Sequence, residues 1–123
     1  SITAKYNPNL KNQWTNLFNY MIAFIETNNL EKSYENALNN RICMGVLGLG
    51  LNECSKANPA STVTKIKNIK NILSDSMISK SYEKFNVNKF SIHWKLFYIF
   101  NKKEMALPSY IMINIIEFLR KRI

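Results

Sequence analysis

The sequence has few of the residues on which catalysis, metal binding and tight turns usually depend. His93 is the only histidine, and Cys43 and Cys54, eleven residues apart in an apolar stretch, are the only cysteines. Without a second pair of ligands nearby, this spacing predicts no zinc site and favours buried, reduced thiols. Three glycines and three prolines in 123 residues favour long regular elements over a loop-rich fold.

Paired carboxylates are also missing. The eight acidic residues are scattered singly, and no Asp-x-Asp is present to hold a divalent metal with a nucleotide. No two acids share an apolar helical face in the spacing that an acid–base pair would use. His93 stands beside Trp94 in an apolar segment, where we expect a structural histidine with satisfied hydrogen bonds. We therefore expect no catalytic residue, no metal site and no cofactor in this chain.

Long hydrophobic runs are absent as well. A membrane-spanning helix needs roughly 20 apolar residues, and the longest run, Ile42–Leu51, has about half of that length and contains three glycines. Residues 1–13 lack the apolar core of a signal peptide. These absences predict no spanning helix and, together with the reduced thiols, a cytoplasmic protein.

The apolar residues that are present recur with the period of a helix, which predicts an all-α fold, a compact bundle of about five helices. The expected helices cover about 9–26, 30–55, 61–77, 91–103 and, with Pro108 in its first turn, 108–122. Residues 76–90 are mixed and polar, and a broken helix over 77–85 is an open alternative. No stretch shows the period-two alternation of a strand.

The same periodicity assigns a buried face to each helix. Asn28 and Asn29 should end the first helix, because Asn tolerates the left-handed cap conformation. The apolar middle of the second helix should be central in the bundle, and Gly45 and Gly48 should let a neighbouring helix approach closely.

A phosphate loop at 45–50 would need a preceding strand and a Lys-Ser/Thr ending, which are missing. The expected buried residues are Leu10, Trp14, Leu17, Phe18, Met21 and Ile25; Leu30, Tyr34 and Leu38; Val63, Ile66, Ile69, Leu73 and Met77; and Ile111, Ile115, Phe118 and Leu119.

Positive charge is confined to the second half of the chain. Residues 1–55 are neutral, whereas residues 56–123 hold thirteen Lys or Arg against four acids and carry the whole net charge of +9. A basic half indicates an anionic partner, either phospholipid headgroups, a nucleic acid or a phosphorylated ligand. The alternative is that the excess lysine only keeps the protein soluble.

Each of the last two expected helices contains aromatic residues and ends in basic ones. This pattern resembles a helix that lies in a bilayer interface, where each basic residue near an anionic surface contributes roughly 1 kcal/mol. The candidate membrane- or acceptor-binding residues are Trp94, Lys95, Lys102, Lys103, Arg120, Lys121 and Arg122. The alternative for Trp94, Phe97, Tyr98 and Phe100 is that they belong to the core while the lysines extend to solvent.

The layout of the chain resembles the C-terminal helical region of bacterial family 2 glycosyltransferases. Ser1-Ile2-Thr3 precedes a polar loop and an amphipathic helix, and the late segments Trp94-Lys95-Leu96-Phe97-Tyr98 and Phe118-Leu119-Arg120-Lys121-Arg122 follow. The resemblance implies that residues 1–123 are one accessory domain of a longer enzyme of capsular polysaccharide, exopolysaccharide or O-antigen synthesis, with residues 1–8 as the linker from a missing catalytic domain. That enzyme would use a nucleotide sugar, a divalent metal and a lipid-linked acceptor at the inner face of the cell membrane.

Two further hypotheses remain open. A helical nucleic-acid-binding protein would use the lysines near Lys65–Lys70, which hold phosphate without reading bases. A structural module would use its apolar helices to form a homo-oligomer. The start at Ser1 is compatible with removal of an initiator methionine and with a segment of a longer protein.

Overall fold

The computed structural model describes residues 6–122 and the side chains as far as residue 120, and every regular element in this part is helical. The elements are α1 (Leu10–Thr27), α2 (Lys32–Glu53), α3 (Thr62–Ser74), α4 (Ser76–Glu83), the 3-10 turn η2 (Val87–Lys89), α5 (Ile92–Lys102) and α6 (Ala106–Arg122). The all-α prediction is confirmed. Over the described residues the structure has one helix more than the expected five. The extra helix is α4, in the segment where the sequence left a broken helix as an alternative.

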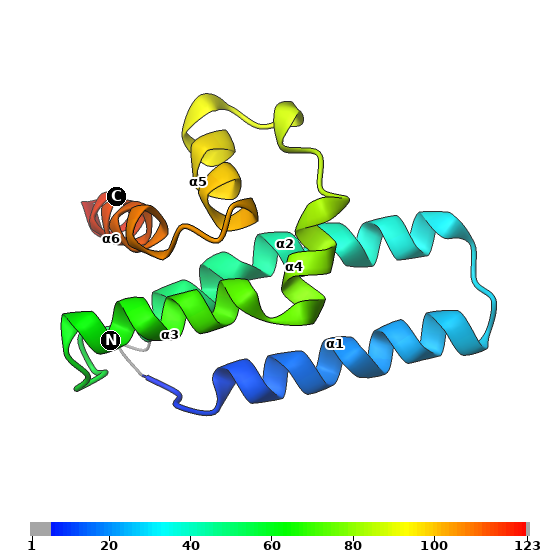
Figure 1. The fold of residues 1–123 in the computed structure, drawn as a ribbon, viewed down its shortest axis with the longest axis horizontal. Coiled ribbons are helices and arrows are strands. Elements are labelled where there is room, and N and C mark those ends of the chain that lie inside the picture. Colours follow the sequence, from blue (N-terminus) through cyan, green and yellow to red (C-terminus); the bar gives the residue numbers. More distant parts are fainter. Residues whose placement is uncertain (1–5, 123) are drawn as a thin grey trace.

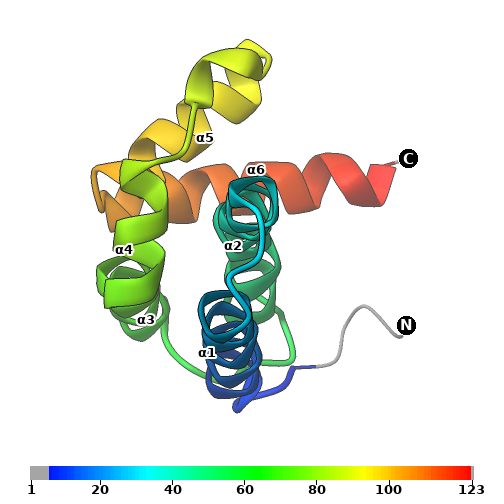
Figure 2. The same ribbon diagram turned by 90° about the vertical axis from the view of Figure 1, so that its right-hand side faces the viewer.

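Helix α2 is the centre of the molecule, as its apolar middle predicted. It contacts α1, α3, α4 and α6, and its residues Ile42, Cys43, Val46 and Leu49 are buried. Helices α1 and α3 lie along it, whereas α6 crosses it and α5 stands between α4 and α6 (Figures 1 and 2).

Two helices end on a residue in the left-handed conformation. Asn29 (φ 48°) follows α1, and the amides of Asn29 and Leu30 donate to carbonyls of the last turn, which is the Schellman arrangement. The expected Asn stop is confirmed. Glu104 (φ 56°) ends α5 with the same pair of hydrogen bonds, although a side chain in this conformation costs roughly 1–2 kcal/mol.

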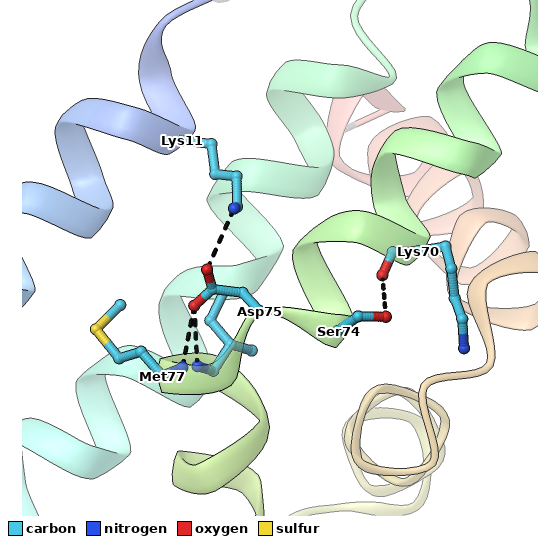
Figure 3. Close-up of polar contacts among 6 residues, drawn as sticks. Lys11, Lys70, Ser74, Asp75 and Met77 are labelled. Carbon is cyan, nitrogen blue, oxygen red and sulfur yellow. Dashed lines mark hydrogen bonds and ion pairs between the residues drawn. The ribbon is translucent and has the colours of Figure 1, made fainter.

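A single residue, Asp75, separates α3 from α4. The expected third helix ran through to Met77, but the chain turns at Asp75 because its Oδ2 accepts from the amides of Met77 and Ile78 at 3.1 and 3.4 Å (Figure 3). Its Oδ1 lies 3.3 Å from Lys11 Nζ of α1. The other end of α3 forms as expected, with Ser61 Oγ accepting from the Thr64 amide.

A chain of buried hydrogen bonds connects α2, α4, α5 and α6. Tyr82 Oη donates to the Cys43 carbonyl at 2.7 Å and accepts from Asn101 Nδ2 at 3.0 Å, and Ser109 Oγ donates to Asn101 Oδ1 at 2.7 Å. Tyr82, Asn101 and Ser109 are each 1% exposed or less. Each of these buried polar atoms therefore has a hydrogen-bond partner, as buried polar groups usually do. We call these four residues the buried polar chain.

Aromatic rings surround the buried polar chain. The Tyr98 ring contacts the rings of Phe85, Phe90 and Trp94 at centroid distances of 5.1, 4.9 and 6.1 Å. Phe85, Phe97 and Tyr98 are buried, so the middle of the aromatic helix belongs to the core.

Two of the three glycines of α2 lie where another helix crosses it closely, and the third does not. A Cβ at Gly45 would lie 3.1 Å from the Trp14 ring of α1, as expected for a close approach, whereas a Cβ at Gly48 would meet nothing within 4 Å. The expectation for Gly48 is therefore wrong. Gly50 makes the second close approach instead, because a Cβ there would overlap Ile113 of α6.

The connection from α2 to α3 is held by one buried carboxylate. Glu53 Oε2 accepts from Asn58 Nδ2 at 2.8 Å and from Asn68 Nδ2 at 3.1 Å. Asn58 Nδ2 also donates to the Glu53 carbonyl. The end of α2, the loop and α3 are thereby joined at a single side chain.

Several expected core residues are exposed instead. The exposed fractions are Leu17 56%, Leu30 36%, Tyr34 56%, Val63 75%, Ile111 49%, Ile115 47%, Phe118 58% and Leu119 55%. Leu30 lies in the connection before α2, which begins at Lys32 and not at the expected residue 30. The spacing of the others along their helices was read correctly, but no other helix in residues 6–122 covers the sides on which they lie. His93 is also exposed, so it is not the core histidine that its apolar surroundings predicted.

Candidate functional site

Helix α5 carries the first part of the candidate site. Trp94 is 37% exposed and stacks on Tyr98, and Lys95 is half-buried. Phe97 and Tyr98 face the core and are buried. The interpretation that this helix belongs to the core thus holds for Phe97 and Tyr98, whereas Trp94 lies at the boundary between core and solvent.

Lys102 and Lys103 lie at the corner between α5 and α6, and both are exposed. Lys70 of α3 reaches the same corner, where its Nζ donates to the Glu104 carbonyl at 2.9 Å. The corner is therefore basic, and cations at the C-terminal end of α5 are also favourable for the helix dipole.

Helix α6 presents an apolar side to solvent. Its Ile113 faces Gly50 of α2, and at 100° per residue the positions 107, 111, 115 and 118 lie on the opposite side. Those positions are Leu107, Ile111, Ile115 and Phe118, exposed by 54%, 49%, 47% and 58%. We call them the outer stripe of α6. An exposed row of large apolar side chains marks an interaction surface more often than a solvated one.

Cations follow the outer stripe at the C-terminal end of α6. Arg120 is exposed and pairs with Glu117 at 2.9 Å. Lys121 and Arg122 continue the helix, but their side chains lie outside the described residues. The opening Ser1-Ile2-Thr3 also lies outside them.

The structure does not bring all candidate residues together. Ala106 and Arg120 are separated by about 21 Å along α6 at 1.5 Å per residue, so the cations of the corner and those of the C-terminal end lie at opposite ends of the outer stripe. The arrangement is a row of apolar side chains between two basic ends. It is not a single basic pocket.

Most of the remaining positive charge lies on α3, α4 and α5. Nine lysines and two acids between residues 62 and 103 give a net charge of +7, whereas residues 10–53, which span α1, α2 and the connection between them, sum to −1. Two of the α3 lysines are held by neighbouring backbone: Lys65 Nζ donates to the Ser55 carbonyl, and Lys70 contacts the corner. Lys67 is exposed. Helix α3 therefore offers few free cations for a nucleic-acid recognition helix.

A groove of about 950 Å³ runs between α1, α2 and α4. Its floor includes Ile22, Ile25 and Ile42, and its walls bear acids from α1 and α2 and lysines from α2 and α4. The volume is typical of a small-molecule site. The mixture of signs gives the groove no marked preference for a charged ligand, and Asn39 on its wall already donates to the Ser81 carbonyl.

Both thiols and the central tyrosine are kept neutral by burial. Burial raises the pKa of Cys43 to about 12, opposed more weakly by Lys102, and raises the pKa of Cys54 to about 11. Burial also raises the pKa of Tyr82 far above its usual range, although the hydrogen bond from Asn101 opposes this effect. Both cysteines are free, as expected, and Cys54 is half-buried. Neither is suited to act as a thiolate nucleophile.

Within residues 6–122, no group of three His, Cys, Asp or Glu side chains is arranged to hold a metal ion. None of the helices in this range combines the length and the hydropathy that crossing a membrane requires.

Sequence reasoning found Ile111, Ile115 and Phe118 of the outer stripe but assigned them to the core, and it missed Leu107, which lies before the expected start of the helix. The signal that could have corrected the assignment is the small number of polar positions on α6, where only Ser109, Asn114, Glu117 and the basic end interrupt the apolar residues. A helix that is apolar on both sides needs a partner on each of them.

No known family model, curated protein or solved structure matches this chain.

Proposed function

We propose that this chain is a non-catalytic helical domain that docks on an anionic membrane surface through the outer stripe of α6 and the cations at its two ends. The observation that carries the proposal is the exposed stripe, with Lys102 and Lys103 before it and Arg120 after it. An interfacial helix inserts its apolar side at the boundary of headgroups and acyl chains, while basic residues contact anionic lipid.

The electrostatic part of the attachment should be moderate and reversible. Five basic residues lie at the two ends of α6 in the sequence, and each contributes about 1 kcal/mol at most near an anionic surface. The Arg120–Glu117 ion pair reduces the contribution of Arg120. Apolar insertion of Ile111 and Ile115 has to supply the remainder.

The sequence resemblance extends this proposal to a parent enzyme. A domain that holds its enzyme at the inner face of the cell membrane would suit a family 2 glycosyltransferase that transfers a sugar from a nucleotide-sugar donor to a lipid-linked or polysaccharide acceptor. The support for this part is the layout of the sequence alone. A longer reading frame that encodes an Asp-x-Asp sequence upstream would support it, and a start codon at residue 1 would count against it.

Co-sedimentation with vesicles tests the docking proposal. We expect binding to vesicles of phosphatidylglycerol and phosphatidylcholine, weaker binding in high salt, and little binding to phosphatidylcholine alone. Ile115→Glu should abolish binding, and the pair Lys102→Gln and Lys103→Gln should weaken it about tenfold or more at roughly 1 kcal/mol per lysine.

Matched variants elsewhere on the surface serve as controls. Val63→Glu places the same charge on an exposed apolar position of α3, and Lys67→Gln removes an exposed lysine of the same helix. Neither should change vesicle binding by more than about twofold, since neither lies on α6 or at its ends. Equal binding to neutral vesicles, or none to any vesicle, would contradict the proposal. Tight, salt-dependent binding to duplex DNA that Lys67→Gln weakens would favour the nucleic-acid alternative.

A further inference from the structure

The corner between α5 and α6 holds three lysines that come from two helices. Lys102 and Lys103 lie at the end of α5. Lys70 reaches the same corner from α3, where its Nζ donates to the Glu104 carbonyl at 2.9 Å. Figure 3 shows the Lys70 side chain extending from α3 toward the connection between α5 and α6. The fold thus adds to Lys102 and Lys103 a third cation from a distant part of the sequence.

The positive charge of the corner exceeds what the fold itself neutralises. Among the described residues, no carboxylate forms an ion pair with Lys70, Lys102 or Lys103. The negative end of α5 is equivalent to about half a charge, and the Glu104 side chain contributes one more. The three lysines therefore leave a surplus of about +1.5 at the corner.

The Lys70 ammonium has donors to spare for an anion. A lysine ammonium carries three N–H donors, and the contact with the Glu104 carbonyl occupies one of them. The same contact holds the end of a long side chain in place, so less conformational entropy is lost when the ammonium binds a ligand. The free donors of Lys70, together with those of Lys102 and Lys103, are directed at one corner from two helices.

Exposed apolar side chains continue directly from the corner. Met105 and Leu107 are 41% and 54% exposed, and Leu107 begins the outer stripe of α6. An anionic group bound at the corner would therefore have an apolar surface beside it. This juxtaposition suits the headgroup of an amphiphile better than a free anion, because the attached acyl chains would lie along the stripe.

On the basis of the membrane docking proposed above, we infer that Lys70, Lys102 and Lys103 form a binding site for the phosphomonoester headgroup of a membrane lipid. A phosphomonoester carries a charge of about −1.5 to −2 at neutral pH and presents three strong acceptor oxygens. Both properties match the surplus charge and the convergent donors of the corner. A phosphodiester headgroup carries one negative charge and has fewer free oxygens, so it uses the site less fully.

Vesicle binding at matched surface potential tests the inference. Vesicles of phosphatidic acid and phosphatidylcholine are compared with vesicles of phosphatidylglycerol and phosphatidylcholine, both adjusted to the same zeta potential. We expect the wild-type chain to bind the phosphatidic acid vesicles about fivefold more tightly, the effect of roughly one additional lysine contact. Lys70→Met should reduce this ratio to less than about twofold.

Two matched variants separate the site from general charge and from the fold. Lys70→Arg retains the charge and the donors and should keep the ratio near fivefold. Lys67→Met removes an exposed lysine of the same helix away from the corner, and it should also keep the ratio. The thermal unfolding midpoint of Lys70→Met should fall by no more than about 5 °C, because one exposed hydrogen bond is lost.

The possible failures are distinguishable. Equal binding of the wild-type chain to both kinds of vesicle would overturn the inference and leave the membrane docking proposal standing. An unchanged preference in Lys70→Met would also overturn it, because Lys70 would then serve only to hold the end of α5. Displacement from the vesicles by millimolar glycerol 3-phosphate would assign the corner to a soluble phosphate ester instead of a lipid. Absence of binding to either kind of vesicle would contradict both proposals.

Discussion

Two regions of the molecule share α2 but are held to it in different ways. The junction of α2, α4, α5 and α6 contains the buried polar chain, with aromatic rings packed around it. Helix α1 packs on α2 through apolar side chains. Polar links also join this part of the chain to the rest: the partly exposed Lys11–Asp75 ion pair, and the hydrogen bonds between Asn7, which precedes α1, and Asn52 of α2. A groove separates α1 from α4.

Directional hydrogen bonds hold α2, α4, α5 and α6 in one relative arrangement at the junction. Helix α1 is attached mainly by apolar contacts, which are not directional and allow small shifts of its position. A buried network is satisfied in one arrangement only, because each misplaced partner leaves a polar group without a hydrogen bond. We therefore expect local opening to begin with α1. Each prediction below changes one side of this comparison.

Removal of Asn101 should have the largest effect. Asn101→Ala leaves the Ser109 hydroxyl without its acceptor and the Tyr82 hydroxyl without a donor, both in the core. We expect a loss of about 3 kcal/mol in the free energy of unfolding, measured by urea titration. Asn114→Ala, which removes an exposed amide of α6 that bonds the Tyr110 carbonyl, is the control and should cost less than about 0.5 kcal/mol. Equal losses for the two variants would contradict the role of the buried polar chain.

Alanine at Gly50 should weaken the junction through its α2–α6 crossing. The added methyl group overlaps the buried side chain of Ile113, and the strain of overpacking exceeds the gain in helix propensity, for a net loss of about 1–2 kcal/mol. Gly48→Ala adds the same group in open space and should instead stabilise the protein by about 1 kcal/mol. Thermal and urea unfolding of both variants should therefore give opposite signs.

Alkaline pH should destabilise the junction through its buried thiol. Cys43 has a pKa of about 12 in the folded chain against 9.0 in the unfolded chain, so above pH 9 the unfolded state loses its proton first. Stability is fully present below pH 9 and falls as the pH rises toward 12, by about 1 kcal/mol at pH 10 from this group. Cys43→Ala should lower stability at pH 7 and flatten this part of the pH profile. A profile equally steep in the variant would exclude Cys43 as its cause.

The ion pair of α1 should matter least. Lys11→Met removes a partly exposed partner of Asp75 and should cost no more than about 0.5 kcal/mol. Asp75→Ala should cost about 1 kcal/mol or more, because the same carboxylate also caps α4. Asp75→Asn retains most of the cap and should resemble Lys11→Met. If Lys11→Met cost as much as Asp75→Ala, α1 would be fixed by charge and the comparison would fail.

The helices themselves were largely predictable, because their signals are local. Ser61 begins α3 and Asn29 ends α1 by hydrogen bonds within a few residues. Pro108 stands in the first turn of α6, as expected, and periodicity located the rest. The break at Asp75 was missed because the apolar spacing continues through it to Met77. An acid whose carboxylate can cap the following turn is a competing local signal.

Which side of each helix is covered was less predictable. Periodicity groups Leu17 with Trp14 and Ile111 with Ile115, but coverage depends on where the other helices lie. The candidate site was affected in the same way: the sequence located its cations at helix ends, whereas their separation along α6 follows from the way α5 turns into α6. The buried polar chain gave only a faint signal, with Asn101 and Ser109 as polar residues beside apolar runs.

The hydrogen bonds of the Glu53 carboxylate determine what would happen if the loop between α2 and α3 were cut. It binds Asn58 and Asn68 from the far side of the loop, so the peptide bond between Lys56 and Ala57 lies inside a ring closed by hydrogen bonds. Cutting that bond would release neither new end, since one stays on α2 and the other stays tied to Glu53. Residues 56 and 57 are therefore a natural place to start and finish a circularly permuted chain.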